Sequence, residues 1–452
     1  MSRDGDLLER AERALEWVRK KAPGIGAEVY MARGRDRGVE RKEGRVEALQ
    51  ESSEEGLGIR LLDGDRMAFA HGGGLGDEVL EEAFARAREQ LRHLPADRER
   101  TLPRVRPASG DAELADSLVD PETFSLPLEG FAARLEAAER AALARDKRLT
   151  KALHSGYGES SASTAIVSTE GVRALESGTS ASAGLSLCGE DAGGVQIGAA
   201  SELARGAGAL DFDRIGRDAA FRTAALLGAK KLPSRRRSVV LDPWVAGEFL
   251  EMLAGALSAD AVQRGRSLFK GRVGEAVASP LVSFVDDPRM RGGLASALHD
   301  DEGVPTRRKA MIEGGVLKEF FHDAYTARRE GRESNGCAGR AGFRGMPSPG
   351  PSNFFLAPGK TGRDELLRGT ADGILVLEIM GMHTADAVSG EFSVGVSGVA
   401  VQGGELAHAV RGAMISANIL DVLNGVDAVA DDLRFYGSIA SPTFRVCGLT
   451  VA

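Results

Sequence analysis

Four glycine-containing turn signals divide the first quarter of the chain at intervals of about ten residues. They are Arg33-Gly34, Glu43-Gly44, Glu55-Gly56 and Asp63-Gly64. The residues between them alternate between apolar and polar, which is typical of half-buried strands joined by tight turns. We therefore predict an antiparallel meander over residues 27–73, flanked by helices at 6–21 and 77–94.

A second stretch, residues 149–208, is rich in glycine, serine and alanine. Such low complexity often indicates disorder, but residues 164–168 and 183–187 keep the apolar spacing of strands, and Glu170-Gly171 is typical of a hairpin turn. We predict strands of small residues that pack closely against a flat surface of the protein. The helices on either side of this stretch are expected at 128–146 and 211–229.

The chain has 452 residues, more than one hydrophobic core usually organises. Composition changes at residues 232–237, so we predict an N-terminal α+β domain over 1–232 and a second domain over 233–452. The second half contains short strands, two Gly-Gly hairpins and a helix at about 415–424. The predicted fold class is α+β, with an N-terminal antiparallel meander flanked by helices and a mostly β C-terminal domain with a few helices.

Charge and cysteine content exclude several classes of protein. A net charge of −8 argues against a nucleic-acid-binding surface. Three widely spaced cysteines give no disulfide framework, which favours a reducing compartment. The charged N-terminus does not resemble a signal peptide, and no window of about 18 apolar residues is long enough for a membrane span. We predict a cytoplasmic protein with no membrane contact.

Common catalytic motifs are missing from the sequence. The nearest approach to a nucleophile elbow, Gly395-Val-Ser-Gly398, has the wrong spacing. The glycines of residues 339–345 lack the G-x-G spacing and the preceding strand of a dinucleotide site, so we interpret this segment as a surface loop.

Metal chemistry remains open as an alternative. No two histidines lie one helical turn apart, as zinc sites usually require. A dispersed site could use His299, Asp300, Asp301, His322 and His383, and would make the chain an autonomous metal-dependent hydrolase. The acidic pairs at 286–287 and 300–301 lack the spacing of a calcium loop, so capping of turns is the preferred interpretation.

Residues 249–260, FLEMLAGALSAD, predict a buried helix that carries one acid. Leu250, Leu253, Ala254 and Leu257 form an apolar stripe at helical period. Glu251 instead lies on a narrow face of small residues. A carboxylate is costly to bury without a partner, so Glu251 is either a catalytic acid or a remnant without a function.

The second half contains, in this order, ADAVQRGRSLFKGRVGEAVASPLVSFVDDP, DDEGVPTRRKAMIEGGVLKEFFHDAYTARREG, MPSPGPSNFFLAPG and SGEFSVGVSGVAVQGGEL. The first half contains AEVY, GRVEALQESSEEGLGIRLL and GYGESSASTAIVSTEGV. Through these segments nearly the whole chain resembles the TldD/PmbA family of bacterial and archaeal proteins. The resemblance implies two domains of the kind described above.

That family has two branches. The TldD-type subunit is a zinc peptidase with an H-E-x-x-x-H motif on the helix after an SVVLDP-like strand, and the PmbA-type (TldE) subunit lacks the motif and pairs with TldD. The resemblance places the motif at Leu250, Glu251 and Gly255 of this chain. Leucine and glycine cannot bind zinc, so Glu251 keeps the position of a general base without a metal-bound water to act on.

The resemblance therefore implies a PmbA-type subunit of a cytosolic TldD/TldE metallopeptidase that acts on unfolded peptides, in peptide maturation and small-protein turnover. Zinc is expected in the TldD-type partner and none in this chain, so whether the chain is itself an enzyme stays open. It would hold peptide in extended form, and a homodimer is also expected. Candidate substrate-binding residues are Asn335, Ser348, Ser352, Asn353 and His383. A structural homodimer without peptidase activity is a further alternative.

Overall fold

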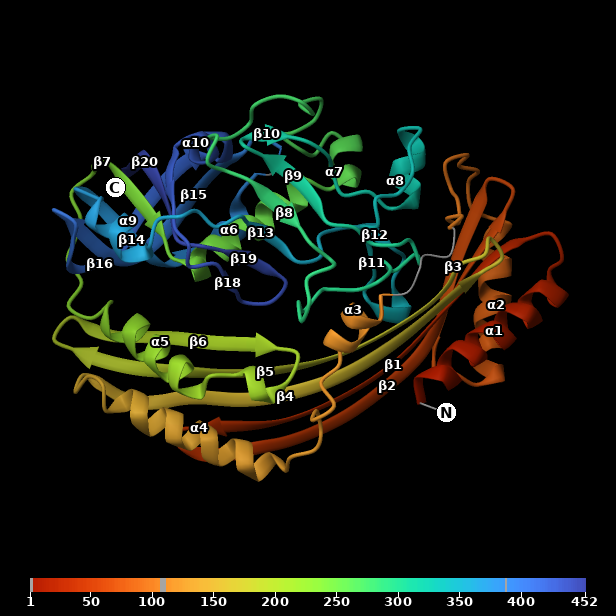
Figure 1. The fold of residues 1–452 in the computed structure, drawn as a ribbon, viewed down its shortest axis with the longest axis horizontal. Coiled ribbons are helices and arrows are strands. Elements are labelled where there is room, and N and C mark those ends of the chain that lie inside the picture. Colours follow the sequence, from red (N-terminus) through yellow and green to blue (C-terminus); the bar gives the residue numbers. More distant parts are fainter. Residues whose placement is uncertain (1–2, 106–110, 387) are drawn as a thin grey trace.

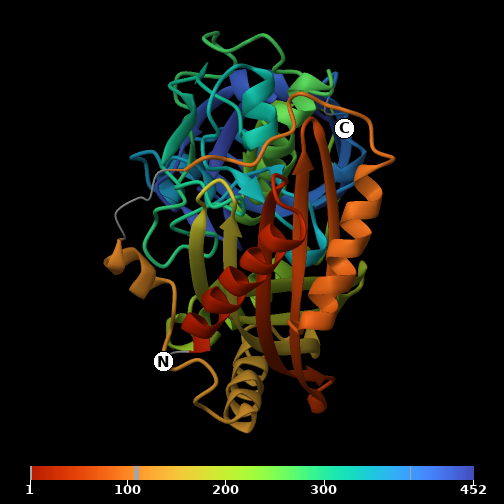
Figure 2. The ribbon, with the colours of Figure 1, turned by 90° about the vertical axis from the view of Figure 1, so that its right-hand side faces the viewer.

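The computed structural model describes residues 3–105, 111–386 and 388–452, and it contains two β-rich parts (Figure 1). A long, strongly curved sheet forms the N-terminal part, and the C-terminal part lies over its concave side (Figures 1 and 2). The observed α+β class confirms the prediction. In the described part of the chain, no helix is both long and apolar enough to span a bilayer.

The N-terminal sheet has six antiparallel strands in the order β3-β2-β1-β4-β5-β6. The meander β1-β2-β3 forms one half of the sheet, and the small-residue strands form the other. Their bounds are β1 (Gly26–Lys42), β2 (Arg45–Asp63), β3 (Arg66–Gly73), β4 (Leu149–Ser168), β5 (Arg173–Asp191) and β6 (Gly194–Ala204).

Two of the four predicted turns are confirmed, and two are wrong. Turns follow β1 at Glu43-Gly44, where both residues have positive φ, and follow β2 at Gly64. Arg33-Gly34 and Glu55-Gly56 lie inside strands instead. Gly56 is a glycine because the site is crowded. A Cβ there would lie 2.3 Å from the ring of Phe343 in the C-terminal part. Glycine within a strand can mark a close approach instead of a turn.

Helices cover one face of this sheet. The predicted helices are confirmed, and each of them except the first ends three to five residues earlier than expected. The first packs on β1 and β4, the second packs on β2 and β3, and the later pair packs mainly on β4, β5 and β6. The bounds are α1 (Arg3–Lys21), α2 (Asp77–Leu91), α3 (Ala112–Ser117), α4 (Leu128–Leu143), α5 (Phe212–Ala224) and the 3-10 turn η1 (Ala207–Ala209).

The small residues of β4, β5 and β6 have two different roles. On the helix-covered face, Gly198 allows α5 to approach, since a Cβ there would lie 2.5 Å from the Thr223 hydroxyl. On the concave face, Ser160 and Ser180 hydrogen-bond to each other at 2.8 Å and stay half-buried. Close packing against a neighbour is therefore confirmed at the α5 face, whereas the concave face stays accessible.

A closed sheet organises the C-terminal part. Its strand order is β16-β15-β14-β7-β20-β17, and a further β16–β20 pairing at Ile415 and Val451 gives it a barrel-like form. The bounds are β7 (Arg235–Leu241), β14 (Asp372–Met380), β15 (Glu391–Gln402), β16 (Glu405–Asn418), β17 (Val426–Val429) and β20 (Phe444–Val451). The helix predicted at 415–424 begins only at Ile419, because β16 continues to Asn418.

A second sheet packs beside the barrel in the order β10-β9-β8-β13-β19-β18. Its strands are β8 (Phe284–Asp286), β9 (Lys309–Glu313), β10 (Val316–Leu317), β13 (Phe354–Leu356), β18 (Arg434–Phe435) and β19 (Ile439–Ser441), with a separate pair β11 (Ala338–Gly339) and β12 (Ser348–Pro349). The remaining helices are α6 (Pro243–Ala256), α7 (Ala259–Gln263), α8 (Ala324–Arg329), α9 (Arg363–Arg368), α10 (Ile419–Asn424), η2 (Gly342–Arg344) and η3 (Met382–Thr384).

Buried charges join the two parts. Arg60 of β2 donates from Nε to Glu28 at 2.9 Å and from Nη1 to Glu302 of the C-terminal part at 2.7 Å. Arg340 pairs with the same Glu28 from the C-terminal side. All four side chains are at most 2% exposed, so removing one charge would leave its partners buried and unpaired.

Candidate functional site

Helix α6 carries the position of the zinc motif, and its start is fixed by buried charges at the end of β7. Asp242 is the N-cap and accepts from the backbone N–H of Trp244 at 3.2 Å. Its carboxylate also pairs with Arg222 and, at 3.0 Å, with Arg363. Pro243 occupies the first helical turn, where a missing N–H costs nothing. The helix therefore leaves the barrel in one defined direction.

The three motif positions do not converge on one face of α6. Leu250 is 0% exposed within the C-terminal core, whereas Glu251 and Gly255 are exposed. Positions five residues apart on a regular α-helix lie about 140° apart around its axis. Two ligands at 250 and 255 would need the helix to end or bend between them, but α6 continues to Ala256.

The residues present at this position do not fit a zinc ion. Leu250 offers only a hydrocarbon that is packed in the core, and the Cβ position of Gly255 faces open space. Glu251 supplies one exposed carboxylate, and a zinc site needs several nitrogen, sulfur or oxygen ligands. Glu248 lies one turn earlier on α6, and burial, with a smaller contribution from the charge of Glu251, raises the pKa of Glu248.

The helix predicted over 249–260 is interrupted. α6 ends at Ala256 with Leu257 as its C-cap, and α7 begins at Ala259. Between them the backbone pairs with Phe321, whose N–H donates to Leu257 O at 3.0 Å and whose carbonyl accepts from Ala259 N at 2.9 Å. The hydroxyl of Ser258 donates to Pro349 O at 3.3 Å. The face of small residues expected at 255–259 is thus partly covered by the chain itself, and Ala259 is 0% exposed.

The dispersed metal candidates have other partners. His299 Nδ1 lies 2.8 Å from Glu176 of β5. Asp300 accepts from three backbone N–H groups, two of them within its own turn, which confirms the turn-capping interpretation there. Burial and the charge of Glu302 raise the pKa of Asp300 to about 8. Asp301 accepts from the backbone of Arg340.

The two remaining histidines do not complete such a site. His322 is 1% exposed, and its nearest carboxylate, Glu330, lies 3.7 Å from Nε2, which is too long for a hydrogen bond. His383 belongs to η3, and its side chain lies outside the described residues. Across residues 3–105, 111–386 and 388–452, no three His, Cys, Asp or Glu side chains are grouped to hold a metal.

The candidate substrate-binding residues lie at different depths. Asn353 is 0% exposed and uses its amide to bind Asp287 O, the Ser296 hydroxyl and the N–H of Ala295. Asn335 is 9% exposed, accepts from His322 N and donates to Phe320 O. These two amides hold loops together.

The serines among the candidates are more accessible. Ser352 is half-buried and donates to Asp286 at 2.9 Å, whereas Ser348 is exposed on β12. Ser348 is therefore the candidate best placed to meet a peptide from solvent.

The structure contains a buried ion pair that the sequence did not predict. Lys309 of β9 is 2% exposed overall, and its Nζ lies 3.1 Å from Asp286 Oδ2 of β8. Burial raises the pKa of Asp286 despite this lysine, and burial raises the pKa of nearby Cys337 to about 12, so that thiol stays protonated. The sequence contains one weak indication that Lys309 is buried. Alternation along β9 places Lys309 on the same face as the buried Met311.

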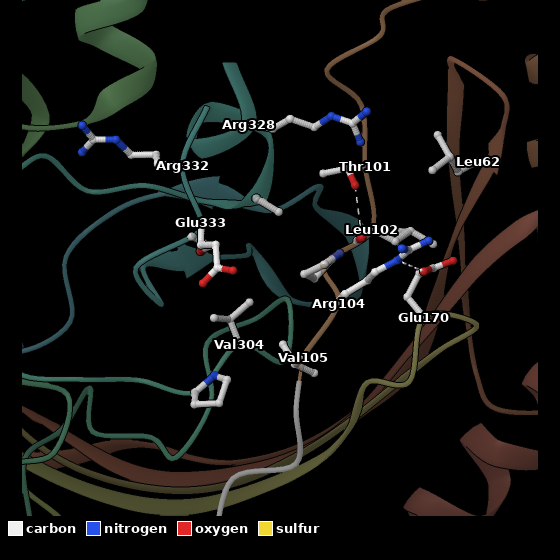
Figure 3. Close-up of a pocket in the computed structure, with 14 residues that line it drawn as sticks. Leu62, Thr101, Leu102, Arg104, Val105, Glu170, Val304, Arg328, Arg332 and Glu333 are labelled. Atoms are coloured by element: carbon white, nitrogen blue, oxygen red, sulfur yellow. Dashed lines mark hydrogen bonds and ion pairs between the residues drawn. The ribbon is translucent and has the colours of Figure 1, made fainter. Parts of the chain in front are cut away.

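A cavity with a volume of about 1010 Å³ lies between the two parts (Figure 3). Arg104 and Glu170 form an ion pair at 2.6 Å on its N-terminal side, and Arg328 and Glu333 come from the opposite side (Figure 3). The lining mixes charged, hydroxyl and apolar groups and includes no residue of α6. Its residues are Leu62, Thr101, Leu102, Pro103, Arg104, Val105, Glu170, Val304, Pro305, Ala324, Arg328, Arg332, Glu333 and Ser334.

Three family models match the chain in order. They describe domain 1, the central domain and the C-terminal domain of PmbA/TldA metallopeptidases, and match residues 27–91, 121–227 and 234–452. A crystal structure of a Thermotoga maritima protein superimposes with a TM-score of 0.88 at 28% identity, covering 98% of this chain and 99% of that one.

Relatives named as metalloproteases match the chain over different lengths. A metalloprotease of Methanocaldococcus jannaschii is 37% identical over 215 residues, so the alignment spans 47% of this chain and about half (47%) of that relative. Metalloprotease PmbA of Escherichia coli O157:H7 is 26% identical over 98% of this chain and 96% of its own length.

Proposed function

Because the chain belongs to the PmbA/TldD metallopeptidase family, we propose that it is the PmbA-type subunit of a cytoplasmic metallopeptidase complex. In this proposal the zinc and the hydrolytic step belong to a TldD-type partner. The present chain assembles with that partner and helps to hold an unfolded peptide in extended form. No step of peptide hydrolysis is assigned to its own residues.

One observation carries the assignment of this branch. The two positions where the zinc-binding branch has histidine hold Leu250 and Gly255, one packed in the core and the other without a side chain. No change of rotamer would give either residue an atom that can bind a metal. The exposed Glu251 lacks a metal-bound water to activate, so it cannot act as the general base of a zinc peptidase from this chain alone.

Two features support a role in peptide binding. The cavity between the two parts has a volume of about 1010 Å³, at the upper end of the volumes of small-molecule sites. Its arginines and glutamates could pair with the charged ends of a peptide. Ser348, which is exposed on β12, has a hydroxyl that could hydrogen-bond to an extended peptide.

A reconstitution experiment tests the proposal. The chain is mixed with a TldD-type subunit from the same host, and the mixture is analysed by size-exclusion chromatography and by cleavage of an unfolded peptide. We expect coelution, and cleavage by the mixture that is abolished by a chelator, with no cleavage by this chain alone. Cleavage by this chain alone, sensitive to a chelator, would instead establish an autonomous hydrolase. Failure to coelute would remove the subunit role.

A further inference from the structure

A second cavity, with a volume of about 220 Å³, lies where the linker between α5 and β7 passes from the N-terminal part to the barrel. Its walls come from three segments, namely the turn between β5 and β6, the linker, and β16. The linker and the β5–β6 turn lie at the left of Figure 1. Sites for drug-sized ligands take about 300–1,000 Å³, so this cavity suits a smaller molecule.

Three cations line this cavity, and one carboxylate opposes them. Lys230 and Lys231 come from the linker and Arg411 comes from β16, whereas Asp191 is the single acid in the described lining. Three positive charges and one negative charge give the lining a net charge of +2, although the whole chain carries −8. Among the residues that the structure describes, none of these three cations forms an ion pair. Their charge is therefore available to a ligand.

The backbone of β16 directs Arg411 toward the cavity. The register between β15 and β16 shifts at Arg411 and Gly412, where two residues lie opposite one residue of β15. Such a β-bulge changes the direction of a side chain, and Gly412 has the positive φ, 68°, that glycine adopts easily. Directly before the bulge, Lys230 N donates to Ala409 O at 2.9 Å. This bond holds the linker lysines beside Arg411.

Gln196 of β6 fixes the orientation of the Arg411 guanidinium. Gln196 is only 8% exposed. In the amide orientation that satisfies both groups, its oxygen accepts from Arg411 Nη1 at 2.7 Å and from Nε at 3.2 Å. A guanidinium has five N–H donors, so three remain for a ligand. The contact also joins the N-terminal part to the barrel, because the two residues come from different parts.

One acid outside the lining interacts with Arg411 through its charge. This acid is Glu378 of β14, whose carboxyl group also bonds to Ser397. Burial raises the pKa of Glu378 even though Arg411 and Arg222 act in the opposite direction. Glu378 therefore does not take the place of a ligand for Arg411.

We propose that Gln196, Lys230, Lys231 and Arg411 form a junction site that binds the phosphate group of a small anion, either free phosphate or a phosphate monoester. A phosphate dianion accepts two parallel N–H bonds from an arginine and has further oxygens for two lysines. A carboxylate has one charge and two oxygens, so it would leave at least one of the three cations without a partner. Bound phosphate would tie the linker to both parts of the chain.

The junction site shares no residue with α6 or with the cavity of Figure 3. The proposal therefore does not depend on the peptidase role proposed above, and neither result decides the other.

Isothermal titration calorimetry tests the junction site. Inorganic phosphate is titrated into the full chain at pH 7.5, in a phosphate-free buffer of constant ionic strength. We expect one site per chain with a dissociation constant of about 1 mM or less. A parallel titration with glycerol 3-phosphate distinguishes the two sources, since tighter binding than phosphate identifies a monoester as the ligand, and equal or weaker binding identifies free phosphate. Acetate should bind at least about tenfold more weakly than phosphate.

Matched variants locate the binding. Arg411→Gln and Lys231→Gln should each raise the dissociation constant of phosphate about tenfold or more, because each removes a charged hydrogen bond. The same changes at exposed residues elsewhere, Arg88→Gln on α2 and Lys360→Gln, should leave it unchanged. Thermal unfolding without phosphate checks that each variant is folded. With phosphate, the midpoint should rise in the wild type and in both controls, and much less in Arg411→Gln.

Three results would overturn the proposal. The first is a wild type that neither releases heat with phosphate nor gains thermal stability from it. The second is phosphate affinity that Arg411→Gln and Lys231→Gln leave unchanged, which would place any binding elsewhere on the chain. The third is acetate binding as tight as that of phosphate, which would show that the cavity does not select a phosphate group.

Discussion

Removing the charge of Asp323 should stabilise the protein at neutral pH but not at acid pH. Asp323 is 4% exposed and caps α8, where its Oδ1 accepts from Thr326 N at 2.8 Å and from the Thr326 hydroxyl at 2.6 Å. Burial, followed by the charge of Glu302, raises the pKa of Asp323 to about 6 from a reference value of 3.8. The folded state therefore holds this proton more tightly than the unfolded state.

The sign and size of the effect follow from linkage. Below about pH 4 both states are protonated, and burial of the neutral acid carries no charge penalty. Between about pH 4 and 6 only the unfolded state loses its proton, so the free energy of unfolding falls as pH rises. Above the folded pKa the loss is complete, and a shift of about 2 units corresponds to about 3 kcal/mol.

The variant Asp323→Asn tests this reasoning. Asparagine keeps the accepting oxygen and is as good an N-cap residue as aspartate, but it cannot ionise. Denaturant unfolding from pH 4 to pH 7.5 should show the variant gaining about 3 kcal/mol over the wild type across that range. The exposed Asp364→Asn on α9 is the control. A stability difference that does not change with pH would refute the assigned cause.

Three further substitutions test the packing and the assignment of α6. Gly56→Ala forces a Cβ against the ring of Phe343 and should cost about 1–3 kcal/mol in thermal unfolding, whereas Gly73→Ala, directly opposite in the sheet with open space, should cost much less. Arg60→Met leaves the buried Glu302 without its cation and Glu28 with Arg340 alone, and it should destabilise by about 3–5 kcal/mol, measured by denaturant unfolding; an unchanged midpoint would contradict the role of Arg60. Glu251→Gln should leave peptide cleavage by the assembled complex within about twofold, since loss of a working general base typically costs 10²–10⁴-fold.

Local patterns predicted the elements of the N-terminal part well. Period-two alternation located the strands, and helical periodicity located the helices that cover them. The errors occurred where a residue distant in sequence decides the outcome. Glu55-Gly56 has the composition of a turn, but Phe343 from the other part explains its glycine. The apolar stripe of residues 249–260 runs past the end of α6 and therefore did not indicate the break. The helix is interrupted there because its backbone pairs with Phe321.

The site was less predictable than the fold. Polar loop residues are reasonable candidates for substrate contact, yet Asn335 and Asn353 turn out to hold buried loops together. The pair of Lys309 with Asp286 depends on two strands that meet only in the folded sheet. By contrast, the loss of the zinc ligands could be recognised from Leu250 and Gly255 alone, because side-chain chemistry at those positions needs no tertiary structure.

Zinc content of the separated subunits tests the central claim most directly. The chain and a TldD-type subunit are purified apart, dialysed against a mild chelator and measured by elemental analysis, and the complex is measured after mixing. The account predicts less than about 0.1 zinc per copy of this chain and about one per TldD-type subunit, in the complex as well as alone. About one zinc per copy of this chain on its own would contradict it.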